Sequence, residues 1–180
     1  MLDLFCGLGG AGAAFRAAGW RVVGVDLDAS LSPDVCADLA SWLWEGERPD
    51  FVWASPPCED FTRRFLPWLA PKHPGEPTQA LALVGAARRI IRETGARWWC
   101  VENVRGAIRW LGSPDQTAGP FMLWTNLPPL RLGGFGPGGV SQRKEHMTSA
   151  ARARRACLPF VVSEAARRAI EDYERQEVLL

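Results

Sequence analysis

A glycine-rich stretch near the start of the chain has the spacing of a ligand-binding turn. Gly7-Leu8-Gly9-Gly10-Ala11-Gly12 fits the pattern G-x-G-x-x-G and lies between an apolar run and an alanine-rich segment. Glycines in such a turn let the backbone approach a ligand closely, and the following helix adds partial positive charge at its N-terminus. Asp26 closes the next apolar run, where a carboxylate can accept hydrogen bonds from both hydroxyls of a ribose. These two features indicate an adenosine-type cofactor, with NAD and S-adenosylmethionine as the alternatives.

A thiol and a carboxyl follow two further apolar runs. Cys58 ends the sequence Ser55-Pro56-Pro57-Cys58 after the run 51–54, and Glu102 directly follows the run 98–101. A free cysteine is only about 3% thiolate at neutral pH, because its pKa is about 8.5, so a nucleophilic Cys58 needs an activating setting. We expect the turn after the two prolines to supply it. A carboxyl near a dry pocket can have a raised pKa and carry a proton at neutral pH, which would suit Glu102.

The elements that must position these side chains alternate between strands and helices. Strands are predicted at 2–5, 21–25, 51–54 and 98–101, and helices at 11–18 and 78–93. Strands that are nearly continuous apolar runs indicate an α/β fold with a mostly parallel sheet covered on both faces. Ligands of such sheets bind beyond the carboxyl ends of the strands, and the glycine turn, Asp26, Cys58 and Glu102 all fall at such ends.

The remainder of the chain is less regular. Residues 56–77 contain six prolines and are predicted to form a long functional loop. A further strand is expected at 121–127, and a final helix at 164–177 with Ser163 as its N-cap. Because the chain has 180 residues and no second hydrophobic core, we expect a single domain spanning 1–180.

Three motifs, in order, resemble those of the C5-cytosine DNA methyltransferases, a family that uses S-adenosylmethionine. Asp3-Leu4-Phe5-Cys6-Gly7-Leu8-Gly9-Gly10 resembles the first motif of the family, Ser55-Pro56-Pro57-Cys58 its proline-cysteine motif, and Glu102-Asn103-Val104 its glutamate-asparagine-valine motif. Asp38-Leu39 lies near the place of the family's adenine contact. The resemblance covers residues 1–104 well and implies a Rossmann-like methyltransferase domain.

The resemblance also implies a role for each matching residue. Cys58 would be the nucleophile, and Glu102 the second catalytic residue. S-adenosylmethionine would be held by Phe5, Gly7, Leu8, Gly9, Gly10, Asp26, Leu27, Asp38, Leu39 and Pro56. The cytosine and its strand would be contacted by Ser55, Pro57, Asn103, Arg143, Arg152 and Arg154.

The implied reaction explains why a thiol and a carboxyl are needed together. C5 of cytosine is a poor nucleophile, but addition of a thiolate at C6 makes the ring an enamine whose C5 can attack a sulfonium methyl group. A protonated Glu102 could hydrogen-bond N3 and the exocyclic amine, which stabilises charge as the Cys58 thiolate adds. A stacked base cannot reach Cys58, so the DNA must be single-stranded or present a flipped cytosine.

The sequence departs from the family pattern in three places. Glu59 follows Cys58 where the family usually has glutamine, and the Gln-x-Arg-x-Arg element of the family has no clean counterpart. The large target-recognition domain is missing, and residues 105–157 form a short insert in its place. Compact bacteriophage-type DNA methylases are similar in this respect. We therefore expect short or relaxed target sites.

Composition and charge exclude several other classes. No apolar run approaches 18 residues, and an acid stands where an export signal needs a base, so we expect a cytoplasmic protein without a membrane span. Two histidines and five cysteines without C-x-x-C spacing predict neither a metal site nor a disulfide framework. Residues 1–60 hold 3 bases and 10 acids, and residues 61–180 hold 18 bases and 10 acids. A basic second part is typical of proteins that bind nucleic acid.

Three alternatives stay open at this point. The same chemistry could act on RNA, as it does in tRNA relatives of the family. An NAD-dependent enzyme would explain the glycine turn and Asp26 but leaves Cys58 and Glu102 without a role. A catalytically silent module that binds nucleic acid, or the partner of a separate recognition subunit, would explain the charge and the short insert.

Overall fold

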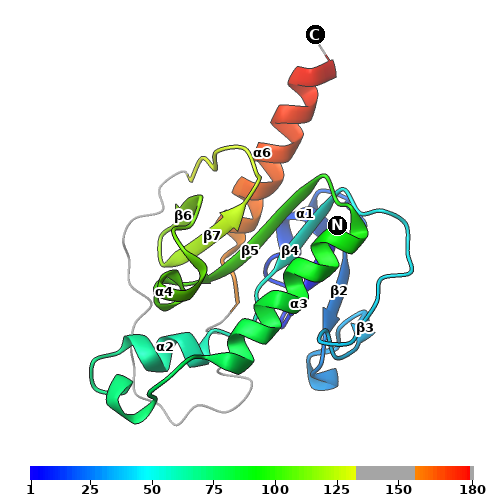
Figure 1. The fold of residues 1–180 in the computed structure, drawn as a ribbon. Helices are drawn as coiled ribbons and strands as arrows, with labels where there is room; N and C mark the ends of the chain where they lie inside the picture. The colour runs from blue at the N-terminus through cyan, green and yellow to red at the C-terminus, as the bar shows by residue number, and fades with distance from the viewer. Residues whose placement is uncertain (133–156, 179–180) are drawn as a thin grey trace.

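The computed structural model describes residues 1–132 and 157–178, which form one seven-stranded sheet with helices on both faces (Figure 1). The strands are β1 (Leu2–Leu4), β2 (Val23–Asp26), β3 (Val35–Cys36), β4 (Phe51–Ala54), β5 (Trp98–Val104), β6 (Gln116–Ala118) and β7 (Phe121–Thr125). Their order is β3-β2-β1-β4-β5-β7-β6. The strands β1 to β5 run parallel, whereas β7 is antiparallel to both of its neighbours. The predicted α/β class with a mostly parallel, Rossmann-like sheet is confirmed.

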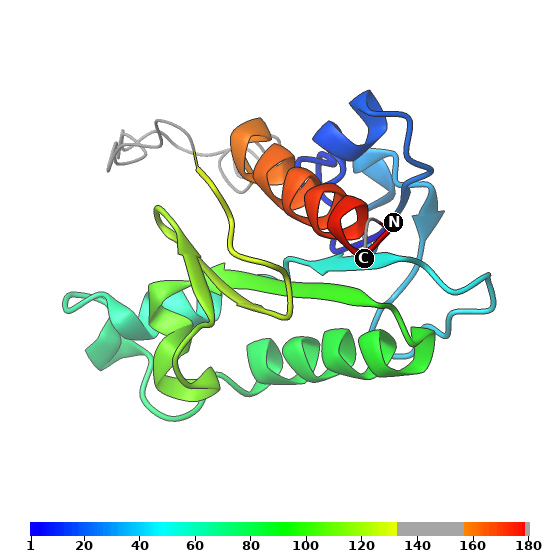
Figure 2. The same cartoon turned by 90° about the horizontal axis from the view of Figure 1, so that it is seen from above.

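Helices cover the sheet from two sides. Figure 2 shows α6 (Phe160–Val178) on one side of β4 and β5, and α3 (Thr78–Thr94) on the other. The short helix α1 (Ala13–Ala17) packs against α6. Two short helices follow the carboxyl ends of β4 and β5: α2 (Glu59–Phe65) and α4 (Ile108–Leu111). Two 3₁₀ turns, η2 (Ala70–Lys72) and η3 (Arg105–Ala107), lie in the same loops. A third 3₁₀ turn, η1 (Ala29–Leu31), follows β2. Within the described ranges, no helix is both long enough and apolar enough to cross a membrane.

Successive side chains of β4 point alternately into two hydrophobic cores, one on each face of the sheet. Phe51 and Trp53 point to the core beneath α1 and α6, and Val52 and Ala54 point to the core beneath α3. All four side chains are fully buried, as a central parallel strand between two helical layers requires. These two cores fix the carboxyl ends of β1, β4 and β5, where the chain enters the loops that carry the candidate site.

The segment 56–77 is not the uninterrupted loop that its prolines predicted. It contains α2 and η2, and α2 begins directly after Cys58. Between Cys58 and Leu66 there is no proline, and ion pairs of the i,i+4 type join Glu59 to Arg63 and Asp60 to Arg64. Acids in the first turn and bases in the last turn also favour the helix dipole, which explains why a short helix forms here.

The expected N-cap at Ser163 is wrong. Helix α6 begins at Phe160, directly after Pro159, whose carbonyl accepts hydrogen bonds from the amides of Val162 and Ser163. Ser163 is fully buried, and its hydroxyl donates to the Ala11 carbonyl at 2.5 Å and accepts from the Ala14 amide at 3.2 Å. The serine therefore joins α6 to the start of α1 instead of capping its own helix.

The stretch 105–157, expected as an insert, is partly built into the sheet. It supplies η3, α4 and the strands β6 and β7, of which β7 is the strand expected at 121–127. β3 and β6 were not predicted because they are two and three residues long and carry no clear apolar run. The part that remains of the insert, residues 133–156, lies outside the described residues.

Candidate active site

The candidate site lies where the order of strands reverses. β1 and β4 are neighbours at the centre of the sheet, and the chain continues outward from them to β2 on one side and to β5 on the other. The carboxyl ends of the strands beside such a switch point form the usual ligand crevice of an open α/β sheet. A cavity of about 440 Å³ lies there, lined by Phe5, Asp26, Leu27, Asp28, Leu31, Ala37, Asp38, Leu39, Ser55, Pro57, Cys58, Glu59 and Leu83.

This cavity brings together half of the ten residues expected to hold a cofactor and the expected nucleophile. Phe5, Asp26, Leu27, Asp38 and Leu39 line it together with Cys58. Its volume falls within the range of about 300–1,000 Å³ that is typical of small-molecule sites. Apolar side chains with a few carboxylates match a ligand that has an apolar ring and several hydroxyl or amino donors. Leu31, Ala37 and Leu83 also line it and were not predicted, because no local pattern marks an apolar residue as part of a pocket.

Asp26 closes β2 and holds the glycine turn in place. Its carboxylate accepts a hydrogen bond from the Gly7 amide at 2.9 Å and another from the Asp28 amide at 3.0 Å. Gly7 and Gly9 have φ angles of +52° and +74°, which favour glycine over residues with a Cβ. A carboxylate has about four acceptor positions, so Asp26 keeps acceptor capacity toward the cavity that it lines.

The other residues of the turn lie outside the main cavity. Gly7, Leu8 and Gly9 line a separate cavity of about 280 Å³, together with Arg16 and Asp34. Gly10 lines neither cavity, and a Cβ on this residue would lie 2.6 Å from the Leu158 carbonyl oxygen. Gly10 therefore packs against the chain that enters α6, and its role as a cofactor contact stays a prediction.

Cys58 is half-buried at the junction of the Pro56-Pro57 turn and α2. Burial raises the pKa of its thiol above the ordinary value, the negative charge of Glu102 raises it further, and a hydrogen bond with Thr62 acts in the opposite direction. The turn after the two prolines was expected to supply an activating setting, but burial and Glu102 act on the pKa of the thiol in the opposite direction. A buried thiol beside a carboxylate is held in the protonated form, so the thiolate needs a change in its surroundings.

Glu102 supplies one such change. It lies in β5, one residue beyond the Val101 that pairs with Ala54 of β4, and burial raises the pKa of its carboxyl to about 7. A hydrogen bond from the Ser55 hydroxyl limits this rise. Near neutral pH the carboxyl is therefore about half protonated, as the proton-donating role requires. A protonated Glu102 carries no charge, which removes its contribution to the raised pKa of Cys58.

Ser55 also has a second hydrogen-bond partner besides Glu102. The indole Nε1 of the buried Trp53 donates a hydrogen bond to the Ser55 hydroxyl oxygen at 2.8 Å. Because an indole N–H can only donate, the hydroxyl proton of Ser55 is directed elsewhere, and Glu102 is its partner. Sequence analysis missed Trp53, since an indole inside an apolar run is indistinguishable from an ordinary core residue.

Asn103 does not line the cavity, and its expected role in substrate binding stays a prediction. Its side chain is only 1% exposed, and its Nδ2 donates to the Pro56 carbonyl at 3.0 Å. Its Oδ1 accepts from the amide of Val104 at 2.9 Å. The amide group thus ties the end of β5 to the turn before Cys58. Pro56, expected to contact the cofactor, is also buried and does not line the cavity.

The three arginines expected to contact the substrate, Arg143, Arg152 and Arg154, lie outside the described residues. Glu59 lines the cavity, and its carboxylate lies 3.8 Å from the guanidinium of Arg63. Among the residues that the structure describes, no group of three or more histidine, cysteine, aspartate or glutamate side chains could hold a metal ion.

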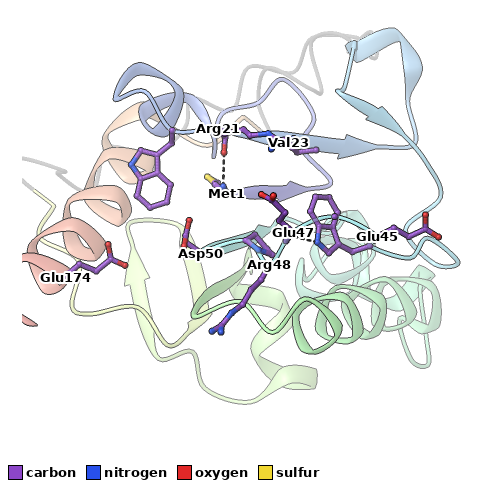
Figure 3. A pocket seen from close by; sticks show the side chains of 12 residues that line it. Met1, Arg21, Val23, Glu45, Glu47, Arg48, Asp50 and Glu174 are labelled. Atoms are coloured by element: carbon purple, nitrogen blue, oxygen red, sulfur yellow. Dashed lines mark hydrogen bonds between the residues drawn. The ribbon is translucent and has the colours of Figure 1, made fainter.

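A larger cavity, of about 770 Å³, lies at the amino ends of the strands, opposite to the candidate site (Figure 3). Met1, Val23 and Asp50, which line it, stand at the amino ends of β1, β2 and β4. The ammonium group of Met1 donates a hydrogen bond to the Arg21 carbonyl at 2.8 Å there. None of the expected site residues lines this cavity, so its size does not make it the candidate active site.

Comparisons with known proteins give structural likenesses at low sequence identity, among them the following two. No family model matches the chain, and no curated protein matches it. One similar solved structure is a prophage-encoded protein (E. coli) provisionally described as a DNA modification methyltransferase, with 21% identity and a TM-score of 0.46. Another is the PH0226 protein from Pyrococcus horikoshii OT3, with 17% identity and a TM-score of 0.38. The matches cover 62% and 64% of this chain, but only 34% and 54% of those chains, and they assign no function to it.

Proposed function

We propose that the protein is an S-adenosylmethionine-dependent methyltransferase that modifies C5 of cytosine in DNA, with Cys58 as the nucleophile. The observation that carries the proposal is the meeting of Cys58 and Glu102 at the carboxyl ends of adjacent strands. The negative charge of Glu102 acts on the Cys58 thiol, and its own pKa is about 7. Cys58 lines the ligand-sized cavity, and Glu102 does not line it but bonds Ser55, which does. A nucleophile and a proton donor therefore lie close to one another beside a cavity.

The residues of the cavity suit S-adenosylmethionine. Asp26 has free acceptor positions at the end of β2 for ribose hydroxyls, and Asp38 can accept from an exocyclic amine. Phe5, Leu27 and Leu39 supply apolar surface for a purine ring. When bound, the cofactor would supply the methyl group and a positive sulfonium charge near the thiol.

The chain's own residues would perform two linked tasks. Glu102, protonated and held by Ser55, would donate a hydrogen bond to N3 of the cytosine and so favour electron flow from C6 into the ring. Loss of its charge also lowers the pKa of Cys58 toward the ordinary value, which increases the thiolate fraction. Asn103 would hold the Pro56 turn, and with it Cys58, in register with β5. Protonation of Glu102 would therefore make its carboxyl a hydrogen-bond donor and also increase the thiolate fraction of Cys58.

Transfer of tritium from methyl-labelled S-adenosylmethionine tests the proposal. DNA, RNA and free nucleotides are offered in parallel, with Cys58→Ala as the inactive variant and Cys36→Ser, an exposed cysteine on β3, as the matched control. We expect label in DNA with the unmodified protein and with Cys36→Ser, and none with Cys58→Ala, which still binds the cofactor in calorimetry. If label appears only in RNA, the substrate is RNA and not DNA. Full activity of Cys58→Ala would exclude a covalent bond between Cys58 and the cytosine.

A further inference from the structure

Two exposed aromatic side chains lie next to the candidate site without a partner that would explain them. Phe65, at the end of α2, is 54% exposed, and Trp68, between α2 and η2, is 64% exposed. A single exposed apolar residue is normal, but neighbouring exposed apolar side chains mark interaction sites, and these two rings are three residues apart in one segment. Helix α2 begins directly after Cys58, so the patch formed by Phe65 and Trp68 is covalently close to the nucleophile.

The segment that carries the patch is basic, with acidic residues only at its two ends. Residues 61–75 contain Arg63, Arg64 and Lys72 and no aspartate or glutamate, and Glu59, Asp60 and Glu76 flank them. Arg63 and Arg64 pair with Glu59 and Asp60. Arg63 and Lys72 are both exposed to solvent. A surface that combines aromatic rings with cations fits a polyanion whose bases have exposed flat faces, which is the chemistry of single-stranded nucleic acid.

The segment is held in shape by Arg64. Its guanidinium bonds the Asp60 carboxylate in α2 and also donates to the carbonyls of Gly75 at 3.1 Å and Glu76 at 3.2 Å. These contacts close the two ends of the segment onto each other. The patch is thus presented on a braced loop, and binding to it costs less ordering than binding to a free loop.

A second basic element packs against the same helix. A Cβ on Gly106 would lie 2.7 Å from the Phe61 carbonyl oxygen and 2.9 Å from Cβ of Phe65, so η3 is in close contact with α2. Arg105, next to Gly106, and Arg109 in α4 are both exposed. Figures 1 and 2 show α2 and α4 side by side beyond the ends of β4 and β5.

We propose that Phe65 and Trp68 form a stacking surface for unpaired bases of the strand that carries the target nucleotide, with Lys72 and Arg105 against its phosphates. The identity of the ligand as DNA rests on the proposed function. Phe65 follows Cys58 by seven positions along α2, which is roughly 10 Å at 1.5 Å per residue. Bases in a stacked strand are about 3.4 Å apart, so the ring of Phe65 is about three nucleotides from the target.

Binding of fluorescently labelled oligonucleotides, followed by anisotropy without cofactor, tests this inference independently of methyl transfer. Single strands with one central cytosine and one to six flanking nucleotides on each side are compared. We expect Trp68→Ala and Phe65→Ala to weaken binding of strands with four or more flanking nucleotides roughly 5- to 150-fold each, the loss of one base–aromatic stack. Strands with a single flanking nucleotide should be affected less than twofold.

Three further variants separate stacking from other effects. Trp68→Phe should restore most of the affinity and Trp68→Leu should not, because only the first retains a flat ring. Lys72→Gln should reduce the slope of log affinity against log salt by about 0.7, the value for one phosphate of a single strand. Leu43→Ala, at another exposed apolar position, is the matched control and should bind like the unmodified protein.

Two results would overturn the stacking surface. The first is affinity of Trp68→Ala and Phe65→Ala equal to that of the unmodified protein at every strand length. The second is a change of sedimentation from dimer to monomer in these variants at unchanged DNA affinity, which would make the patch a contact between two copies of the chain. If the unmodified protein binds no nucleic acid at all, the proposed function itself fails, and this inference fails with it.

Discussion

Replacement of Asp3 by asparagine should make the protein more stable at alkaline pH. Asp3 lies within β1 and is only 1% exposed, and its Oδ2 accepts a hydrogen bond from the Gly12 amide at 3.1 Å. Burial raises the pKa of this carboxyl to about 7, although the positive charge of Arg16 opposes the rise. An asparagine side chain at this position would have nearly the same shape, no charge, and an oxygen that can still accept from Gly12.

The sign and size of the effect follow from the raised pKa. A carboxyl whose pKa is higher in the folded state than in the unfolded state contributes stability below pH 4, and that stability is lost as the pH rises through about 7. The difference from an ordinary aspartate is about three pKa units, or roughly 4 kcal/mol at full ionisation. Asp3→Asn should therefore differ little from the unmodified protein near pH 4 and exceed it by about 3–4 kcal/mol at pH 8.

Urea unfolding, followed by tryptophan fluorescence at several pH values between 4 and 8.5, measures the difference. Glu45→Gln, which removes an exposed acid, is the matched control, and its effect on the free energy of unfolding should not change with pH in this way. A loss of stability in Asp3→Asn that is the same at pH 5 and pH 8 would refute the reasoning. It would mean that Asp3 is ionised in the folded state and that Arg16 compensates its charge.

Three further outcomes are expected from the site. Asn103→Ala should lower the free energy of unfolding by about 2–4 kcal/mol in urea titrations, since it leaves the Pro56 carbonyl and the Val104 amide without their partner; a loss below 0.5 kcal/mol would remove Asn103 as a positioning residue. Glu102→Gln should lower the pKa of the Cys58 thiol and speed its alkylation by iodoacetamide at pH 8, mapped by mass spectrometry, and an unchanged rate would show that the two groups do not interact. Asp26→Ala should weaken binding of S-adenosylmethionine by about 1.5–3 kcal/mol in calorimetry, whereas tight binding of NAD alone would favour a dehydrogenase-like site.

The sequence was sufficient for the parts of the molecule that depend on local pattern. Continuous apolar runs predicted β1, β2, β4 and β5. A strand that is buried on both faces of a sheet consists mostly of apolar residues, so its sequence is easy to recognise. Placing chemically reactive residues at the ends of those runs then located the cavity that Asp26 and Cys58 line. Helix α2 was missed since prolines around it outweighed its charge pairs in the interpretation of the segment.

The parts that the sequence could not supply depend on contacts between distant elements. Ser163 has the chemistry of an N-cap, yet its partners are at the start of α1, some 150 residues away along the chain. Asn103 belongs to a recognisable motif, but only the pairing of β4 with β5 brings it to the Pro56 carbonyl. The raised pKa of Cys58 likewise depends on burial and on Glu102, which no local pattern reveals.

Covalent trapping on DNA that contains 5-fluorocytosine tests most directly whether Cys58 is the nucleophile. Fluorine at C5 cannot leave as a proton does, so the bond between the enzyme and C6 of the ring persists after methyl transfer. We expect a denaturation-resistant complex that forms only with S-adenosylmethionine present, and peptide mapping by mass spectrometry that places the base on Cys58. An adduct on Cys6 or Cys157, or methylated DNA without any adduct, would contradict the assignment of Cys58.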